Sequence, residues 1–309
     1  MKTAQNELKS MKIKHGKLYQ NDKWYAYAMI SPVVLGFACL MLFPLLYEFY
    51  LSLTNAKLLG NVNFIGFENY ENLFGNDPLF TKSILNSLYF SGVLVPLNIS
   101  LAILLAVLLN RQLRGIGIFR TLVFLPSITP IVVWALVWKL ILSTDAGILN
   151  AFLKIIGITG PAWLFDVHLT MPVLIVNTVL KGVGLNMVIF LGALKSIPVV
   201  YYEAAMIDGA KPFRTFVNVT LPMLSPTIFM VTVTTIISSL KIFSNVYMLT
   251  NGGPANSTSL LVFYIYYKAF KEFNFGYAAA IAAVLFVIIL IITLIQWSLR
   301  RRLVYAENE

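Results

Sequence analysis

Six long apolar runs are the feature that most constrains how this chain can fold. They cover residues 25–50, 84–109, 119–142, 169–194, 222–249 and 276–299. At about 1.5 Å per helical residue, each run is long enough to cross a hydrocarbon core of about 30 Å. Only 12% of the 309 residues are charged and the mean hydropathy is +0.80, whereas a soluble domain has about 25% charged residues. We therefore predict an all-α integral membrane protein with six transmembrane helices.

The basic residues predict how these spans are oriented. The two terminal segments and the loops 2–3 and 4–5 between spans hold 15 Lys and Arg, whereas the opposite loops hold 5. Because basic loops remain in the cytoplasm, both termini are predicted to be cytoplasmic. The net charge of +10 therefore faces lipid headgroups, and no nucleic-acid partner is expected. The 15 residues are Lys2, Lys9, Lys12, Lys14, Lys17, Lys23, Arg111, Arg114, Arg120, Lys195, Lys211, Arg214, Arg300, Arg301 and Arg302.

The domain organisation follows from these spans. Residues 1–24 form a basic cytoplasmic tail, residues 25–300 the six-helix transmembrane domain, and residues 301–309 a second cytoplasmic tail. The first run is too long for the apolar part of a secretory signal, so we expect it to be retained. The third run is the least regular, because Pro126, Pro130 and Lys139 interrupt it.

A polar loop, residues 195–222, separates the fourth and fifth runs and is predicted to contain a short helix. Ser196 is a plausible cap and Pro198 suits an early helical position. Gly209 fits the position just past the helix end, and Pro212 prevents continuation. The helix would then have about eleven residues, with one face made of Val199, Tyr202 and Met206. Such a helix either lies on the membrane surface or docks onto another protein.

The same loop carries a spaced motif. It reads Glu203-Ala204-Ala205, three residues, Gly209, nine residues, Val219, one residue, then Leu221-Pro222. It resembles the signature of the membrane subunits of ATP-driven importers, in which the Val219 position is Ile. Three further segments resemble the same family, the last of them its carbohydrate branch: Gly182-Val183-Gly184 with Asn186-Met187, Leu249 to Pro254 with Thr258, and Phe64 to Tyr70.

The resemblance implies a type I importer transmembrane domain whose coupling helix lies between helices 4 and 5. It places Glu203, Ala204, Ala205 and Gly209 against an ATPase, and the nearby Asp208 and Arg214 are further candidates for the same contact. It further implies a multi-pass subunit of a bacterial cell membrane with no catalytic role. Its partners would be a second permease subunit, two cytoplasmic ATPase subunits, an extracytoplasmic solute-binding protein, membrane lipid and an oligosaccharide. ATP and Mg would be bound by the ATPase subunits, since this sequence has no phosphate-binding G-x-x-x-x-G-K-[ST] loop.

Polar residues inside the apolar runs are candidates for the substrate path, because polar groups in hydrocarbon usually face other helices or water. On one continuous fifth helix, Ser238 and Asn245 would share a face with Lys241 between them. The alternatives are that Ser and Thr bond their own helix and that Lys241 extends to the interface. The candidates are Asn177, Lys181, Asn186, Ser238, Lys241, Asn245 and Tyr247, the last as an aromatic platform for a sugar.

The sequence leaves a second function open, that of a stand-alone secondary sugar transporter. Ion-coupled carriers often place carboxylates within their spans, but Glu48 is the one carboxylate inside a predicted span here. No nucleophile–base pair indicates an enzyme, and the single Cys39 and two distant His residues give no metal site. The positive charges of Lys181 and Lys241 slightly favour anionic sugars as substrates. The choice between neutral and anionic oligosaccharides stays open.

Overall fold

The computed structural model describes residues 24–111 and 114–303, so most of the predicted tail 1–24 and residues 304–309 lie outside the description. Across the described residues the chain is helical, and only two isolated bridges, Thr54–Phe64 and Lys57–Asn274, have β geometry. Five helical segments are long and apolar enough to cross a membrane, namely Trp24–Ser52, Pro78–Leu109, Thr170–Ser196, Pro212–Leu240 and Phe275–Arg300. A bent pair of helices, Ile116–Ile128 and Ile131–Ile141, is a sixth candidate span when the two are counted together. The predicted all-helical membrane fold is confirmed.

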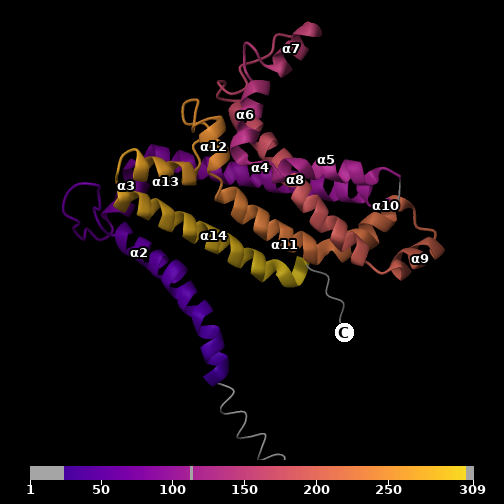
Figure 1. Ribbon diagram of the computed structural model, residues 1–309, viewed down its shortest axis with the longest axis horizontal. Helices are drawn as coiled ribbons and strands as arrows, with labels where there is room; N and C mark the ends of the chain where they lie inside the picture. The colour runs from indigo at the N-terminus through magenta and orange to yellow at the C-terminus, as the bar shows by residue number, and fades with distance from the viewer. Residues whose placement is uncertain (1–23, 112–113, 304–309) are drawn as a thin grey trace, which may run out of the picture.

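The elements follow the chain in this order (Figure 1). They are η1 (Ala38–Leu42), α2 (Phe43–Ser52), α3 (Glu68–Asn76), α4 (Pro78–Leu109), α5 (Ile116–Ile128), α6 (Ile131–Ile141), α7 (Ile148–Ile155), α8 (Thr170–Ser196), α9 (Val199–Ile207), α10 (Pro212–Thr215), η2 (Phe216–Thr220), α11 (Leu221–Leu240), α12 (Ser244–Leu249), α13 (Leu261–Phe270) and α14 (Phe275–Leu303). The segments η1 and η2 are π-helical stretches within longer helices.

The helices α4 and α8 form the centre of the bundle. They pack along each other, α5 lies against α8, and α11 contacts α4, α8 and α14. Phe90, Leu174, Met187 and Phe190 are fully buried between these helices. A second, smaller core joins α3, α13 and α14 to the start of α4. We call the two ends of this bundle the α9 end and the α12 end, after the short helices that lie there.

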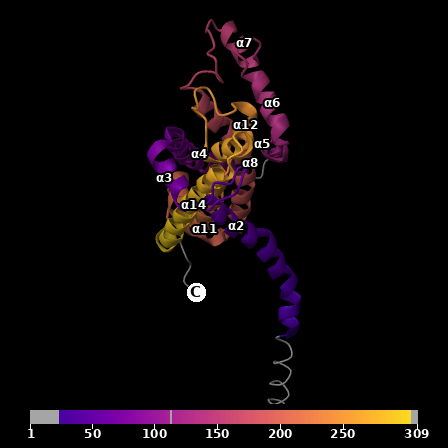
Figure 2. The same ribbon diagram turned by 90° about the vertical axis from the view of Figure 1, so that its left-hand side faces the viewer.

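The first span stands apart from the rest of the bundle. In Figures 1 and 2 it leans away from the other helices, and its contacts with the chain run through α2 to α14. None of its most apolar window is buried within the chain. Exposed apolar surface of this extent is unfavourable in water. The first span is therefore stabilised by lipid or by another protein chain.

The third span differs from the prediction of one helix over residues 119–142. It is two helices, α5 and α6, which meet at 102°. Thr129 is extended at φ −65° and ψ 132°, and Pro130 follows with ψ 138°. Proline pushes the residue before it out of the helical region and cannot donate a backbone hydrogen bond. The break at Pro130 is the direct consequence.

The fifth span also differs from its predicted range of 222–249. Its helical course starts at Pro212, which begins α10 and therefore starts a helix rather than only stopping one. It ends at Leu240, with Lys241 as the C-cap. Phe243, at φ −128°, separates it from the short helix α12. The prediction of a helix continuous to residue 249 was wrong.

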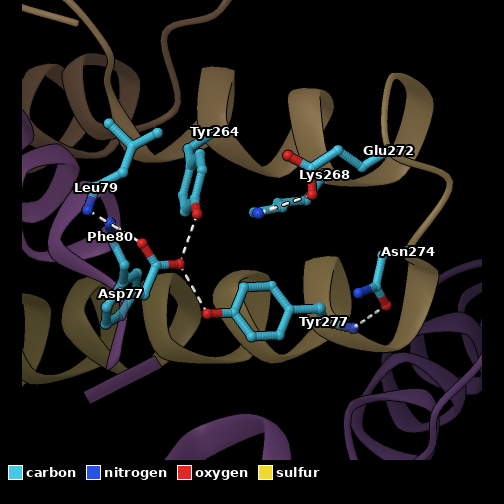
Figure 3. Close-up of polar contacts among 8 residues, drawn as sticks. All are labelled: Asp77, Leu79, Phe80, Tyr264, Lys268, Glu272, Asn274 and Tyr277. Carbon is cyan, nitrogen blue, oxygen red and sulfur yellow. Dashed lines mark hydrogen bonds and ion pairs between the residues drawn. The ribbon is translucent and has the colours of Figure 1, made fainter. Parts of the chain in front are cut away.

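One carboxylate ties three helices together at the α12 end (Figure 3). Asp77 precedes α4 and accepts from the backbone N–H groups of Leu79 at 3.0 Å and Phe80 at 2.9 Å. Its other oxygen accepts from Tyr264 on α13 at 2.5 Å and Tyr277 on α14 at 2.7 Å. Burial raises the pKa of Asp77, but these hydrogen bonds and the nearby Lys268 charge outweigh burial, so the pKa lies below its ordinary value. The ionised form is the one that holds the helices.

We expect this cluster to make the protein acid-sensitive. Since the folded pKa of Asp77 is lowered, its stabilisation is present above the unfolded pKa of about 3.9 and is lost as pH falls through the folded value. Asp77→Asn should therefore flatten the fall in unfolding free energy below about pH 4, measured by thermal unfolding in detergent. The exposed Asp145→Asn is the control. An unchanged acid limb in Asp77→Asn would contradict this assignment.

We expect Gly184 to be required for the contact of α5 with α8. A Cβ atom there would lie 2.3 Å from the Val123 carbonyl oxygen and 2.8 Å from Phe124 Cα, both backbone atoms of α5. Gly184→Ala should lower the unfolding free energy by about 1–3 kcal/mol because the two backbones must separate. Gly192→Ala on the same helix, where a Cβ meets nothing within 4 Å, is the matched control in thermal unfolding. Similar stabilities for the two variants would refute the close contact.

Candidate functional site

The helix α9, between the fourth and fifth spans, is shorter than predicted. It has nine residues rather than eleven, and it starts after Pro198, which is extended at ψ 135°. Ser196 is the last residue of α8. Its hydroxyl donates to the Ala193 carbonyl oxygen at 2.8 Å, so it does not cap α9 as predicted. Pro198 lies before the helix because its extended backbone forms the turn out of α8.

The end of α9 matches the prediction for Gly209. This residue adopts φ +66°, a left-handed conformation that glycine enters without a Cβ penalty. Its N–H donates to the Met206 carbonyl at 3.0 Å, and the Ala210 N–H donates to the Ala205 carbonyl at 2.9 Å. These two bonds make a Schellman motif, which satisfies the last carbonyls of the helix. Gly209 therefore fixes where α9 ends.

The surface of α9 is uncovered. No α9 residue is buried, and Met206 and Ile207 are 76% and 86% exposed. The predicted face of Val199, Tyr202 and Met206 does not pack as a unit, because Tyr202 turns back toward the span and its hydroxyl lies 3.3 Å from Thr220 Oγ1. The other candidates on this loop point outward: Glu203, Ala204, Asp208, Gly209 and Arg214 are exposed and Ala205 is half-buried. The arrangement presents apolar and charged groups side by side.

Lys181, near the middle of α8, binds the free carbonyl groups at the break in the third span. Its Nζ donates to the carbonyl oxygens of Thr129 at 2.6 Å and Pro126 at 3.1 Å, and lies 5.7 Å from the Trp134 ring centroid. The last carbonyls of a helix have no intrahelical partner, and in lipid no water can satisfy them. A cation at a helix C-terminus is also favoured by the helix dipole. Lys181 therefore holds the end of α5.

The two asparagines on α8 face different neighbours, because Asn177 lies four residues before Lys181 and Asn186 lies five residues after it. Asn177 Oδ1 accepts from Trp134 Nε1 at 3.2 Å, so it shares the α6 side with Lys181. Asn186 instead donates to Asn98 Oδ1 at 2.6 Å and Thr235 Oγ1 at 3.3 Å. It is turned toward α4 and α11.

The predicted stripe of Ser238, Lys241 and Asn245 does not form, because the fifth helix ends at Leu240. Ser238 is exposed and its hydroxyl donates to the Thr234 carbonyl of its own helix at 2.8 Å. Lys241 is also exposed. Asn245, by contrast, is buried on α12 and donates to Thr178 Oγ1 at 3.0 Å. Two buried polar atoms, Asn245 Oδ1 and Asn177 Nδ2, have no hydrogen-bond partner within the described part of the chain.

Tyr247 is part of an aromatic cluster at the α12 end. Its ring stacks on Phe243 at 5.4 Å and meets Tyr266 edge-on at 5.3 Å. Tyr266 also contacts Phe243 at 4.9 Å and Phe270 at 5.5 Å. Sequence reasoning identified only Tyr247. The other rings belong to the break and to α13, and the tight turn signal Asn251-Gly252-Gly253-Pro254 is what indicates that α13 folds back toward α12.

We expect Lys181→Met to destabilise the bent span. Methionine keeps the length of the side chain but donates no hydrogen bond, so the Thr129 and Pro126 carbonyls lose the ammonium donor. The unfolding free energy should fall by about 1–3 kcal/mol, measured by thermal unfolding of the purified chain. Lys139→Met, at an exposed lysine of α6, should change it by less than about 0.5 kcal/mol. Equal effects of the two changes would show that Lys181 does not hold the break.

Comparison with known proteins identifies the family to which this chain is similar. The family described as binding-protein-dependent transport system inner membrane component matches residues 98–305. The probable ABC transporter permease protein YesP of Bacillus subtilis (strain 168) is 35% identical over 301 residues, 96% of this chain and 97% of that protein. The lactose transport system permease protein LacF of Rhizobium radiobacter is 35% identical over 92% of this chain and 96% of that protein.

A solved structure agrees with the sequence relatives. It is a bacterial alginate ABC transporter in complex with an alginate pentasaccharide-bound periplasmic protein, and one of its chains superposes with a TM-score of 0.82 at 26% identity. The alignment covers 91% of this chain and 96% of that chain. This chain is therefore a member of the family of binding-protein-dependent transport inner membrane components, the multi-pass, non-catalytic permease subunits of ABC importers.

Proposed function

We propose that this chain is the permease subunit of an ATP-driven importer for oligosaccharides, that it forms half of the translocation pore, and that α9 couples this pore to an ATPase. The observation that carries the proposal is α9 itself. It lies past the bundle on the chain's basic side, ends on a fixed Gly209 motif, and leaves Met206 and Ile207 uncovered beside Glu203. Exposed apolar surface rimmed by charge is typical of a protein interface.

The connection from α9 to the bundle supports a coupling role. The Tyr202 hydroxyl meets Thr220 Oγ1 of η2, and η2 continues directly into α11. The helix α11 in turn contacts α4, α8 and α14. A displacement of α9 by a partner therefore acts on the fifth span and, through it, on the centre of the bundle. Coupling requires that the nucleotide state of the partner changes which pore conformation is favoured.

The remaining partners follow from the family and from charge. A second permease subunit would cover the exposed first span and complete the pore. Two ATPase subunits would bind ATP and Mg, and a solute-binding protein would deliver the sugar on the opposite side. The 15 basic residues in the terminal segments and in the loops between spans 2–3 and 4–5 of the sequence support a cytoplasmic position for α9.

Carbohydrate is the substrate class that the site favours. An aromatic cluster around Tyr247 offers apolar faces for a sugar ring, and Asn245 beside it has an unused amide oxygen. Relatives are named for transport of lactose and arabinooligosaccharides. Asn177, Asn186, Ser238 and Lys241 remain candidates for the path. The ammonium of Lys181 already binds two backbone carbonyls. Its charge therefore no longer favours anionic sugars, and neutral oligosaccharides are equally suited. A stand-alone secondary sugar transporter, the alternative, gives no role to the uncovered α9.

We expect Glu203→Ala and Gly209→Pro each to lower oligosaccharide uptake by about tenfold or more, within the 5–150-fold span of typical coupling energies. The first removes a carboxylate that can pair with a basic group, and the second imposes a negative φ where the chain needs +66°. Uptake in cells and co-purification of the ATPase subunits are the measurements, with membrane insertion unchanged. Lys211→Ala, an exposed residue of the same loop, is the control. Normal uptake in both variants would contradict a coupling role for α9.

A further inference from the structure

A cavity of about 600 Å³ lies at the α9 end, where α4 ends, α5 begins and α8 leads into α9. In Figure 1 these elements gather at the right-hand end of the molecule. Three cationic side chains, Arg111, Arg120 and Lys195, line it, and none of its lining residues is acidic. A concave site with cations of one sign raises the local concentration of anions.

The cations of this cavity are held in different ways. Arg120 is fixed, because its Nε and Nη2 donate to the Leu109 carbonyl oxygen, the last of α4, at 3.1 and 2.6 Å. Arg111 and Lys195 are exposed. Within the described residues the one ion pair is Lys268–Glu272, at the other end of the molecule. Among residues 24–111 and 114–303, no carboxylate therefore pairs with the cations of the cavity.

The position of the cavity along the membrane normal places it beside lipid headgroups. The helix α4 has 32 residues, or about 48 Å, which exceeds a hydrocarbon core of about 30 Å. Its apolar run ends at Leu109, and the polar Asn110 and Arg111 follow directly, so this end of α4 is placed in the headgroup layer, where basic residues flank a span. The cavity also has apolar walls, formed by Ile116, Ile197 and Val199. Cations beside apolar walls at this depth match a phosphate that is joined to acyl chains.

We propose that this cavity binds a phosphate group, supplied by an anionic phospholipid of the adjacent leaflet. Arg120 is the fixed anchor, and Arg111 and Lys195 close around the phosphate from the ends of α4 and α8. Because Val199 and Tyr202 of α9 belong to the same lining, the bound headgroup contacts the helix that projects from the bundle. The site does not depend on which sugar, if any, the protein transports.

Native mass spectrometry of the full-length purified chain tests this site, with phosphatidylglycerol and phosphatidylcholine of the same acyl chains as probes. The wild type should bind phosphatidylglycerol more tightly. Arg111→Gln with Lys195→Gln should weaken this binding by about tenfold or more and leave phosphatidylcholine unaffected, since each basic residue near an anionic headgroup contributes. Lys211→Gln with Arg300→Gln removes the same charge at exposed positions outside the lining and should keep wild-type binding. Circular dichroism confirms that both variants are folded.

Competition with inorganic phosphate shows whether the bound phosphate group comes from lipid or from solution. If inorganic phosphate at millimolar concentration displaces phosphatidylglycerol, the phosphate site is supported and its source is soluble phosphate; no displacement supports the lipid. Equal weakening in both double variants would overturn the proposal in favour of diffuse surface charge. So would a wild type without preference for phosphatidylglycerol. Loss of ATPase co-purification with unchanged lipid binding in Arg111→Gln, Lys195→Gln would likewise overturn it, because the cavity would then belong to a protein contact.

Discussion

Backbone groups inside a membrane must find partners within the protein, and this requirement governs the structure. Water does not reach the hydrocarbon core, so an interrupted helix is tolerated only where other groups satisfy its free N–H and C=O groups. The third span is interrupted at Pro130, and Lys181 donates to the Thr129 and Pro126 carbonyls there. An ammonium group alone in lipid is unfavourable, and so is a carbonyl group without a donor. The Lys181 ammonium and these carbonyls offset each other's cost.

The second interruption has a different purpose. Where α11 ends at Leu240, the chain turns and α12 inserts against α6 and α8. This turn brings Asn245 into the interior beside Thr178 and brings Tyr247 against Phe243 and Tyr266. A continuous helix would have directed these residues along a single face of the fifth span. The break thus brings amide and aromatic groups from three helices together at one end of the bundle.

The sequence predicts those features that depend on local chemistry. The positions of the five long apolar helices follow from apolar run length. The end of α9 follows from Gly209, whose left-handed conformation few other residues adopt. Pro126 and Pro130 both interrupt the third run, but Pro126 lies inside α5 and the bend occurs at Pro130. No Gly or Pro marks the end of α11 at Leu240. That end, the burial of Asn245 and the partner carbonyls of Lys181 depend on tertiary contacts, which a single sequence does not specify.

We propose that this chain is one subunit of a larger transporter and that α9 connects it to the subunits that hydrolyse ATP. Reconstitution into sealed liposomes tests this most directly. A labelled oligosaccharide is added outside, and the amount of label that accumulates inside the liposomes is measured. The account predicts no uptake by the purified chain alone, and uptake only when the second permease subunit, the ATPase subunits with ATP and the solute-binding protein are present. Uptake by the chain alone, at the rate of the complete assembly, would contradict it.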